Sequence, residues 1–283
     1  MTIRLIRTSS RGSISSYRLT RHLGFGFDSS FWFRHSSLSP RMPRRFHVPI
    51  LTTGDVPLDA VQSRHARDVL RLAHGAAVEL FDDAGRVAAG EIVAGDAAVV
   101  TVRVAAVRER STDRLRLVVA SAVPKGNRAD WMVEKLSELG VDAFVPLAAA
   151  RSVVLPEGRG KSERWERIST EAAKQSRRTG VMAIEPLASV AEVMKSRPVG
   201  SPAWCLSTEP GTVPAATALN DLSSSPGQTL TLFIGPEGGW TDAELATFAA
   251  AGVRPIRLTQ SVLRIETAAL AAAAVVMTTV APS

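Results

Sequence analysis

The pattern of apolar and polar positions changes character near residue 112. From residue 42 to about residue 110, short runs of β-forming residues alternate with turn-forming residues, a spacing typical of a small β-barrel or meander. A short helix at residues 65–72 is expected before these strands. The predicted strands occupy residues 77–81, 86–93 and 97–107, with turns at residues 82–85 and 95–96.

Beyond a charged stretch at residues 108–114, strand and helix patterns alternate. Residues 115–122 have the pattern of a buried strand, and residues 129–139 that of a helix stopped by Gly140. A further strand follows at residues 143–147, and such a strand–helix–strand unit predicts a parallel sheet. Further helices are expected at residues 161–176 and 189–195, and further strands at residues 183–185 and 203–207.

The stretch from residue 229 to residue 270 contains the strongest candidate for a binding site. An apolar strand is predicted at residues 229–234, followed by the glycine turn Gly235-Pro236-Glu237-Gly238-Gly239. Thr241 and Glu244 have the spacing of a capping box, which predicts a helix from Asp242 to about Ala251. The layout then repeats, with a strand at residues 254–259, a turn at residues 260–265 and a helix at residues 266–280.

Both predicted turns follow strands and lead into helices. In open parallel sheets, ligands bind at the carboxyl ends of the strands, so one site shared by the two turns is expected. The glycines allow positive φ and a close approach of a ligand to the backbone, while Glu237 adds a carboxylate. The alternative is that both turns only connect a strand to a helix, since isolated glycine turns are weak signals.

Composition is ordinary for a globular chain, and the charge is unevenly distributed. The 283 residues are 45% hydrophobic and 22% charged, and the apolar run at residues 268–274 is too short to span a bilayer. The net charge is +7, but residues 1–41 contain seven arginines and one acid, Asp28, which leaves the remainder almost neutral. Any basic surface that binds nucleic acid must therefore be local.

Three regions follow from these patterns. Residues 1–41 form an Arg- and Ser-rich leader without the apolar core of a secretory signal. It is interpreted either as a disordered tail from an over-extended start or as an organellar targeting segment, so the expected location is the cytoplasm or an organelle. Residues 42–112 form the β-barrel domain and residues 113–283 the α/β domain.

Several common kinds of site are not supported. The single cysteine, Cys205, excludes an internal disulfide and a cysteine-rich zinc site, and the five histidines are scattered, so no metal is expected. The Gly158–Ser162 stretch ends like a phosphate-binding loop of NTPases, but Leu155 stands where its first glycine should be. No Gly-x-Gly-x-x-Gly follows a strand, so a Rossmann dinucleotide site is not indicated.

Several separated motifs resemble one enzyme family. FIGPEGGWTDAE at residues 233–244 and VLRIETAALAA at residues 262–272 resemble the two signature loops of the RsmE-type 16S ribosomal RNA uridine-N3 methyltransferases, which belong to the SPOUT superfamily. HARDVLRLAHG, PKGNRADWMVEKLSELGV and EAAKQSRR match upstream, so the resemblance extends from about residue 42 to the end. It implies a trefoil-knotted methyltransferase domain that binds S-adenosylmethionine, preceded by a PUA-like RNA-binding barrel.

The resemblance also implies roles for individual residues in methylation of N3 of a uridine in 16S ribosomal RNA. Arg264 is expected to stabilise the uridine anion or orient the base, and Glu266 to accept a proton or hold Arg264; an ion pair at a helix start is the structural alternative. A homodimer is expected, and no metal. The expected cofactor-binding residues are Leu206, Gly235, Pro236, Glu237, Gly238, Gly239, Leu258, Leu263 and Thr267.

Basic residues along the chain are expected to contact the RNA of the small ribosomal subunit. On pattern alone, the basic residues of the helix at residues 65–72 favour a solvated face over an RNA site, and only the resemblance indicates RNA contacts. Thr259-Gln260-Ser261 and Ile265 depart from the family pattern, so the alternative function is a non-catalytic RNA-binding or ribosome-assembly factor with the same fold. The expected RNA contacts are Arg44, Arg45, His65, Arg67, Arg71, Lys125, Arg177 and Arg178.

Overall fold

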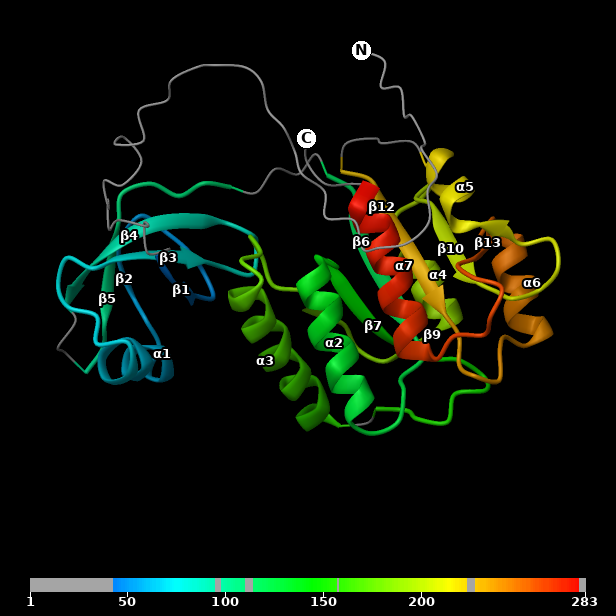
Figure 1. Ribbon diagram of the computed structural model, residues 1–283, viewed down its shortest axis with the longest axis horizontal. Helices are drawn as coiled ribbons and strands as arrows, with labels where there is room; N and C mark the ends of the chain where they lie inside the picture. The colour runs from blue at the N-terminus through cyan, green and yellow to red at the C-terminus, as the bar shows by residue number, and fades with distance from the viewer. Residues whose placement is uncertain (1–42, 95–97, 110–113, 157, 223–226, 280–283) are drawn as a thin grey trace, which may run out of the picture. The chain divides into compact units, whose positions relative to one another are not determined.

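The computed structural model of the protein describes residues 43–94, 98–109, 114–156, 158–222 and 227–279 (Figure 1). The predictions for the leader at residues 1–41, for the turn at residues 95–96 and for most of the linker lie outside the described residues. Within them, the strands form two sheets, one of five strands and one of eight.

The first sheet follows the β-rich part of the sequence. Its strand order is β1-β3-β4-β5-β2, with β1 and β3 parallel and the other neighbours antiparallel. The sequence did not predict β1 and β2, because runs of four residues with a proline or histidine do not show a clear alternation. The strands are β1 (Arg44–His47), β2 (Gly54–Pro57), β3 (Ala77–Phe81), β4 (Val87–Ala94) and β5 (Thr101–Val104).

The helix expected at residues 65–72 begins and ends earlier. It consists of α1 (Ala60–Arg64) and a π-helical turn, η2 (His65–Val69). The start is fixed by Asp59, whose carboxylate accepts a hydrogen bond of 2.7 Å from the backbone N–H of Gln62. The predicted start at residue 65 was therefore wrong, because the N-cap is Asp59 and the helix begins at Ala60.

The second sheet is parallel throughout, as the strand–helix–strand pattern predicted. Its order is β11-β13-β10-β12-β6-β7-β8, and β9 pairs with β7. The strands are β6 (Arg116–Ser121), β7 (Ala143–Ala148), β8 (Ala183–Ile184), β9 (Ala188–Ser189), β10 (Ala203–Leu206), β11 (Val213–Pro214), β12 (Thr229–Ile234) and β13 (Arg254–Arg257). The helices are α2 (Asn127–Leu139), α3 (Arg159–Gln175), α4 (Val190–Ser196), α5 (Ala215–Asn220), α6 (Asp242–Ala250) and α7 (Ile265–Thr279).

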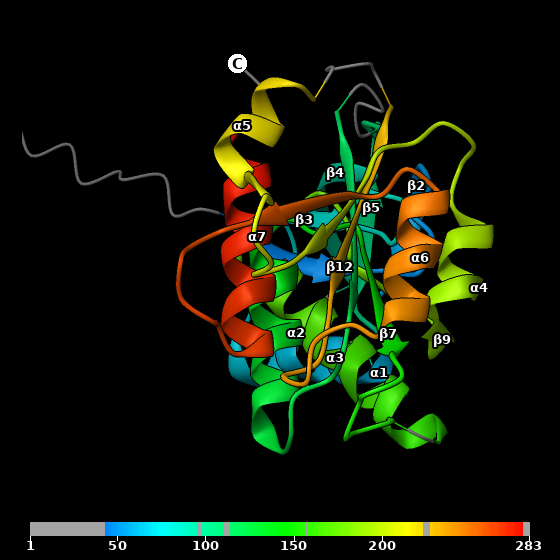
Figure 2. The same cartoon turned by 90° about the vertical axis from the view of Figure 1, so that its right-hand side faces the viewer.

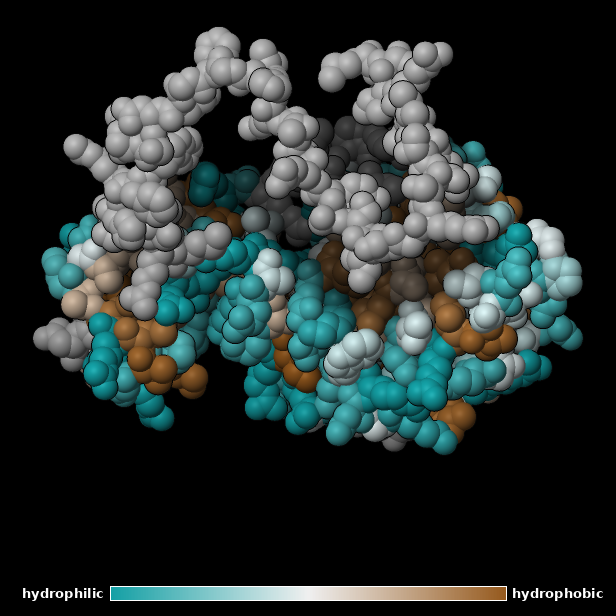
Figure 3. Space-filling model, viewed as in Figure 1, coloured by the Kyte–Doolittle hydropathy of each residue, from teal (hydrophilic) through white to brown (hydrophobic). Residues whose placement is uncertain are grey.

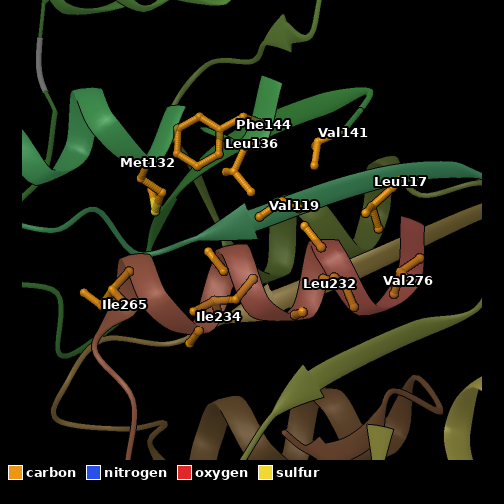
Figure 4. Close-up of a cluster of buried hydrophobic side chains, with 14 of the residues drawn as sticks. Leu117, Val119, Met132, Leu136, Val141, Phe144, Leu232, Ile234, Ile265 and Val276 are labelled. Atoms are coloured by element: carbon orange, nitrogen blue, oxygen red, sulfur yellow. The ribbon is translucent and has the colours of Figure 1, made fainter. Parts of the chain in front are cut away.

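Helices cover both faces of this sheet. In Figure 2, α2, α3, α5 and α7 lie on one side of it, and α4 and α6 lie on the other. Figure 4 shows the larger core, in which Leu117 and Leu232 of the sheet meet Leu136 of α2 and Val276 of α7. The alanines of α7 on this side are fully buried, and their small side chains let α7 pack closely against the sheet and α2.

Two local signals read from the sequence are confirmed. Gly140 ends α2 in the left-handed conformation with φ of 97°, and a Cβ there would lie 2.9 Å from Cε of Met277. Thr241 and Glu244 form both hydrogen bonds of the capping box at the start of α6. None of the helices in the described part of the chain is long and apolar enough to cross a membrane.

Cys205 lies in β10 at the centre of the sheet. Its side chain is buried between the layers, and burial raises the pKa of the thiol to about 11. The interpretation of this residue as a small buried hydrophobe agrees with its position.

Candidate active site

The segments that follow β10, β12 and β13 meet at the carboxyl edge of the parallel sheet. These three strands are neighbours in the order β13-β10-β12, so their ends lie side by side. Together they enclose a cavity of about 350 Å³, which is within the usual range for small-molecule sites. The two turns therefore line one cavity, and the end of β10 contributes a third wall.

The first turn, from Gly235 to Trp240, is tightly packed. A Cβ on Gly235 would lie 3.0 Å from the indole ring of Trp240, so any larger residue at 235 would require this ring to shift. Gly239 has φ of +71° and open space around its Cα, while its N–H donates to the carbonyl of Pro236 at 2.9 Å. Both positions therefore favour glycine, Gly235 because of close packing and Gly239 because of its backbone conformation.

Trp240 joins the end of β12 to the end of β10. Its indole Nε1 donates a 3.0 Å hydrogen bond to the carbonyl of Leu206, and its ring makes an edge contact with Phe248 at 4.9 Å between centroids. Helix α6 begins directly after this residue, and its capping box fixes the exit of the turn. The carbonyl of Leu206 therefore already accepts a hydrogen bond from within the protein.

The second turn, from Thr259 to Arg264, is more open. Leu258, Val262 and Leu263 line the cavity, and Val262 is at the same time 77% exposed to solvent. Within the turn, the hydroxyl of Thr259 donates to the carbonyl of Ser261 at 2.8 Å. The side chain of Arg264 is exposed and forms no ion pair with any residue that the structure describes.

Glu266 lies in the first turn of α7 and faces α2. Its Oε1 accepts a 3.1 Å hydrogen bond from Nη1 of Arg128, and its Oε2 is buried without a partner among the described side chains. The side chain of Glu266 is 8% exposed, whereas that of Arg128 is 40% exposed. Glu266 is thus paired with Arg128 of α2, and the alternative ion pair between Glu266 and Arg264 is not present among the described residues.

The structure brings together most of the residues expected to bind the cofactor. Of the nine, all except Thr267 line the cavity; Thr267 is exposed on α7 outside the lining. Trp240 and Arg151, which also line it, were not predicted. Trp240 directly follows the glycine turn, and this position in the sequence could have predicted its place in the cavity. Arg151 follows β7, and nothing in the sequence links it to this site.

The residues expected to contact RNA differ in exposure. Arg45 is buried in an ion pair with Glu79 and lies 4.3 Å above the ring of Phe81. Arg178 is also buried, donates to the carbonyl of Ser137 at 2.9 Å, and has its pKa lowered to about 10 by burial. Both side chains therefore have contacts inside the fold.

The other expected RNA contacts lie at or near the surface. Arg67 is half-buried and pairs with Asp68 at 2.7 Å. Arg71 is exposed and has a positive φ of 52°, as has Arg177 with 57°. The remaining exposed members of the set are Arg44, His65 and Lys125.

Across the residues that the structure describes, no three His, Cys, Asp or Glu side chains are placed to hold a metal ion.

Comparison with known proteins identifies close similarity over most of the chain. Residues 111–277 match the family model of the RNA methyltransferase domain. The chain is 36% identical over 163 residues to ribosomal RNA small subunit methyltransferase E of Bacillus subtilis, which covers 55% of this chain but only 63% of that protein. It is 32% identical to the protein of the same name from Mycobacterium tuberculosis, over 80% of this chain and 88% of the relative.

A solved structure has the same fold. The structure of ribosomal RNA small subunit methyltransferase E from Neisseria gonorrhoeae, bound to S-adenosyl methionine, superposes with a TM-score of 0.70 at 27% identity. The match covers 84% of this chain and 98% of that one.

Proposed function

Because the chain belongs to the ribosomal RNA small subunit methyltransferase E family, we propose that it transfers a methyl group from S-adenosylmethionine to N3 of a uridine in 16S ribosomal RNA. The observation that carries this proposal is the cavity at the ends of β10, β12 and β13, which both family-like turns line. The sequence resemblance and the three-dimensional arrangement thus point to the same residues.

The cavity fits S-adenosylmethionine in size and chemistry. Adenine needs apolar walls, and Leu206, Leu258 and Leu263 supply them. The methionine part carries charged and polar groups, for which the open backbone at Gly239 and the exposed carboxylate of Glu237 are suited. The departure Thr259-Gln260-Ser261 does not close the cavity, since Thr259 and Ser261 line it.

Arg264 is proposed to act in the chemical step. The bound sulfonium supplies an activated methyl group, so the protein must align the uridine and stabilise it as N3 loses its proton. Arg264 stands between Leu263 and Ile265, both of which line the cavity, and its guanidinium is exposed without an acid partner among the described residues. An uncommitted cation at this point can stabilise the anion that develops on the base.

Glu266 is proposed to fix the start of α7 and so the position of Arg264. The hydrogen bond from Arg128 ties this carboxylate to α2, and burial keeps it away from bulk water. A role as proton acceptor would use Oε2, which is buried and has no partner among the described residues.

The five-stranded sheet is proposed to be the PUA-like domain that binds RNA. Its domain is assigned to residues 42–112 and the methyltransferase domain to residues 113–283, with a trefoil knot in the latter. The surface residues Arg44, His65, Arg67 and Arg71 are its proposed RNA contacts, and Lys125 and Arg177 those of the second domain. Because these contacts are cationic, RNA affinity should fall as salt concentration rises.

A homodimer is also proposed. Helix α7 is rich in alanine and valine, and in Figure 3 apolar surface is visible in its region. Leu270 and Val275 of this helix are only partly covered within one chain. A second copy would complete this burial, in keeping with the frequency of two-fold homodimers. The proposed location is the cytoplasm.

Binding and product analysis test the proposed function. Calorimetry should detect S-adenosylmethionine binding, which the alternative of a non-catalytic RNA-binding factor does not predict. Small subunits from cells that lack the native enzyme should gain one N3-methyluridine when incubated with the protein and the cofactor, as read by mass spectrometry. Cofactor binding without any methylated uridine would contradict the assigned substrate.

A further inference from the structure

The segment after β7 reaches the cofactor turn although β7 is not a neighbour of β12. Strand β6 lies between them in the sheet. Nevertheless Ala150 and Arg151, which follow β7, contact the region between Gly238 and Glu244. The glycine turn is therefore held by a residue from outside the three strands whose ends form the cavity.

Arg151 makes three contacts with the glycine turn. Its Nη1 donates to the carbonyl of Gly238 at 2.7 Å and to the carbonyl of Trp240 at 3.2 Å. Its aliphatic stem covers Gly238, where an added Cβ would lie 3.3 Å from Cβ and Cδ of the arginine. One guanidinium nitrogen thus bridges the two carbonyls on either side of Gly239.

A second contact reinforces this connection. The N–H of Ala150 donates to Oε1 of Glu244 at 2.9 Å, while Oε2 of the same carboxylate completes the capping box of α6. Glu244 therefore links the end of β7 to the exit of the glycine turn. The two contacts hold the turn from the side opposite to Trp240 and Leu206.

We propose that Arg151 is a positioning residue for cofactor binding, an inference that rests on the proposed function of the cavity. A turn with glycine at 235, 238 and 239 loses much backbone entropy when it is ordered. The carbonyls of Gly238 and Trp240 belong to the 238–239 and 240–241 peptide planes, whose N–H groups donate to the carbonyl of Pro236 and to Oε2 of Glu244. Holding both planes restricts the backbone between them, so less entropy is lost when a ligand binds against the turn. Arg151 thereby orders the turn before the cofactor arrives.

If Arg151 had a purely structural role, its removal would lower the stability of the whole protein. The positioning role predicts a local effect instead. Arg151 is exposed and forms no ion pair with the described residues, so its removal should change global stability little. Its hydrogen bonds involve only backbone groups of the turn, so the loss should appear there.

Substitution by methionine separates the hydrogen bonds from the packing. Arg151→Met keeps an unbranched stem over Gly238 but removes both donors, and Arg151→Lys keeps a cationic donor that lacks the planar shape of guanidinium. Arg254→Met is the matched control, because Arg254 pairs with Asp221 at 2.8 Å in the same sheet, away from the cavity lining.

Two measurements on the full chain test the inference. In ligand-free protein, hydrogen exchange at residues 238–240 should be at least several-fold faster in Arg151→Met than in the wild type or in Arg254→Met. The dissociation constant for S-adenosylmethionine should rise about tenfold, as expected for loss of a hydrogen bond from a charged donor, and Arg151→Lys should recover part of it. The melting temperature should match that of the control.

The outcomes distinguish this inference from the proposed function. Unchanged exchange at residues 238–240 and unchanged affinity in Arg151→Met would overturn the positioning role even if the wild type binds the cofactor. If the wild type bound no S-adenosylmethionine, the proposed function would fail, while the exchange comparison would still decide whether Arg151 orders the turn.

Discussion

The two turns that form the cavity are built in opposite ways. The first, from Gly235 to Trp240, is held on one side by the indole of Trp240 against Leu206 and on the other by Arg151. The second, from Thr259 to Arg264, has one internal hydrogen bond, and its side chains at 259–262 are exposed.

This difference separates two tasks. A site that binds one small molecule benefits from backbone fixed in advance, because the entropy of ordering has already been lost in folding. A surface that meets a large RNA benefits from exposed groups that remain available. The first turn is therefore expected to set cofactor affinity and the second to set the rate of methyl transfer.

The largest expected effect is on the rate, from Arg264→Ala. Loss of a donor that stabilises developing anionic charge lowers a rate by about two to three orders of magnitude. Affinity for S-adenosylmethionine should stay within a few-fold, since the sulfonium is itself cationic, and Arg264→Lys should recover little. Single-turnover methylation and calorimetry measure the two quantities. Equal losses in rate and affinity would show that Arg264 only supports the turn.

Gly235→Ala should disturb the first turn most. The new Cβ would lie 3.0 Å from the ring of Trp240, and overpacking of this kind costs about 1–3 kcal/mol. Cofactor affinity should fall with stability, measured by calorimetry and by denaturant unfolding. Gly160→Ala is the control, because Gly160 lies in α3 with open space around its Cα, and alanine there should be neutral or stabilising.

The two capping boxes allow a helix start beside the cavity, that of α6, to be compared with a remote one, that of α4. Thr241→Ala and Ser189→Ala each remove the N-cap of a helix with the same hydrogen-bond pattern, α6 and α4 respectively. Each should lower the free energy of unfolding by about 1 kcal/mol. Only Thr241→Ala should also weaken cofactor binding, because it releases the exit of the first turn. Similar affinities in the two variants would mean that the cap does not reach the cavity.

The smallest effect is expected from Val262→Ala in the second turn. Val262 is 77% exposed, so its truncation should change stability by less than about 0.5 kcal/mol. Cofactor affinity should also remain unchanged, as titration calorimetry can verify. A marked loss of affinity would indicate that the second turn is as closely coupled to the cofactor as the first.

Local chemistry determined which features the sequence could reveal. The capping box at Thr241, the αL glycine at Gly140 and the parallel sheet are set by neighbouring residues, and all three appear in the structure. The carboxyl-edge cavity followed from topology in the same way. The observed bounds of some elements differ by a few residues from the predicted ones, as for the helix that begins after its N-cap Asp59.

Contacts between distant residues could not be read from local patterns. Arg128 reaches Glu266 across 138 positions, and Arg151 reaches Gly238 across 87. The contacts of Arg45 and Arg178 inside the fold likewise depend on partners supplied by folding, so charge alone did not reveal them. Pairings of this kind depend on tertiary packing, which a single sequence does not encode in any fixed spacing.

The buried thiol of Cys205 has a practical consequence. It is the single cysteine of the chain, and a thiol whose pKa is raised to about 11 is almost entirely protonated at neutral pH and reacts slowly with alkylating reagents. A cysteine introduced at exposed Ser261 would therefore be labelled selectively. A spectroscopic probe can therefore be attached to the second turn without first removing the native cysteine. Its signal would allow RNA binding to be followed in real time.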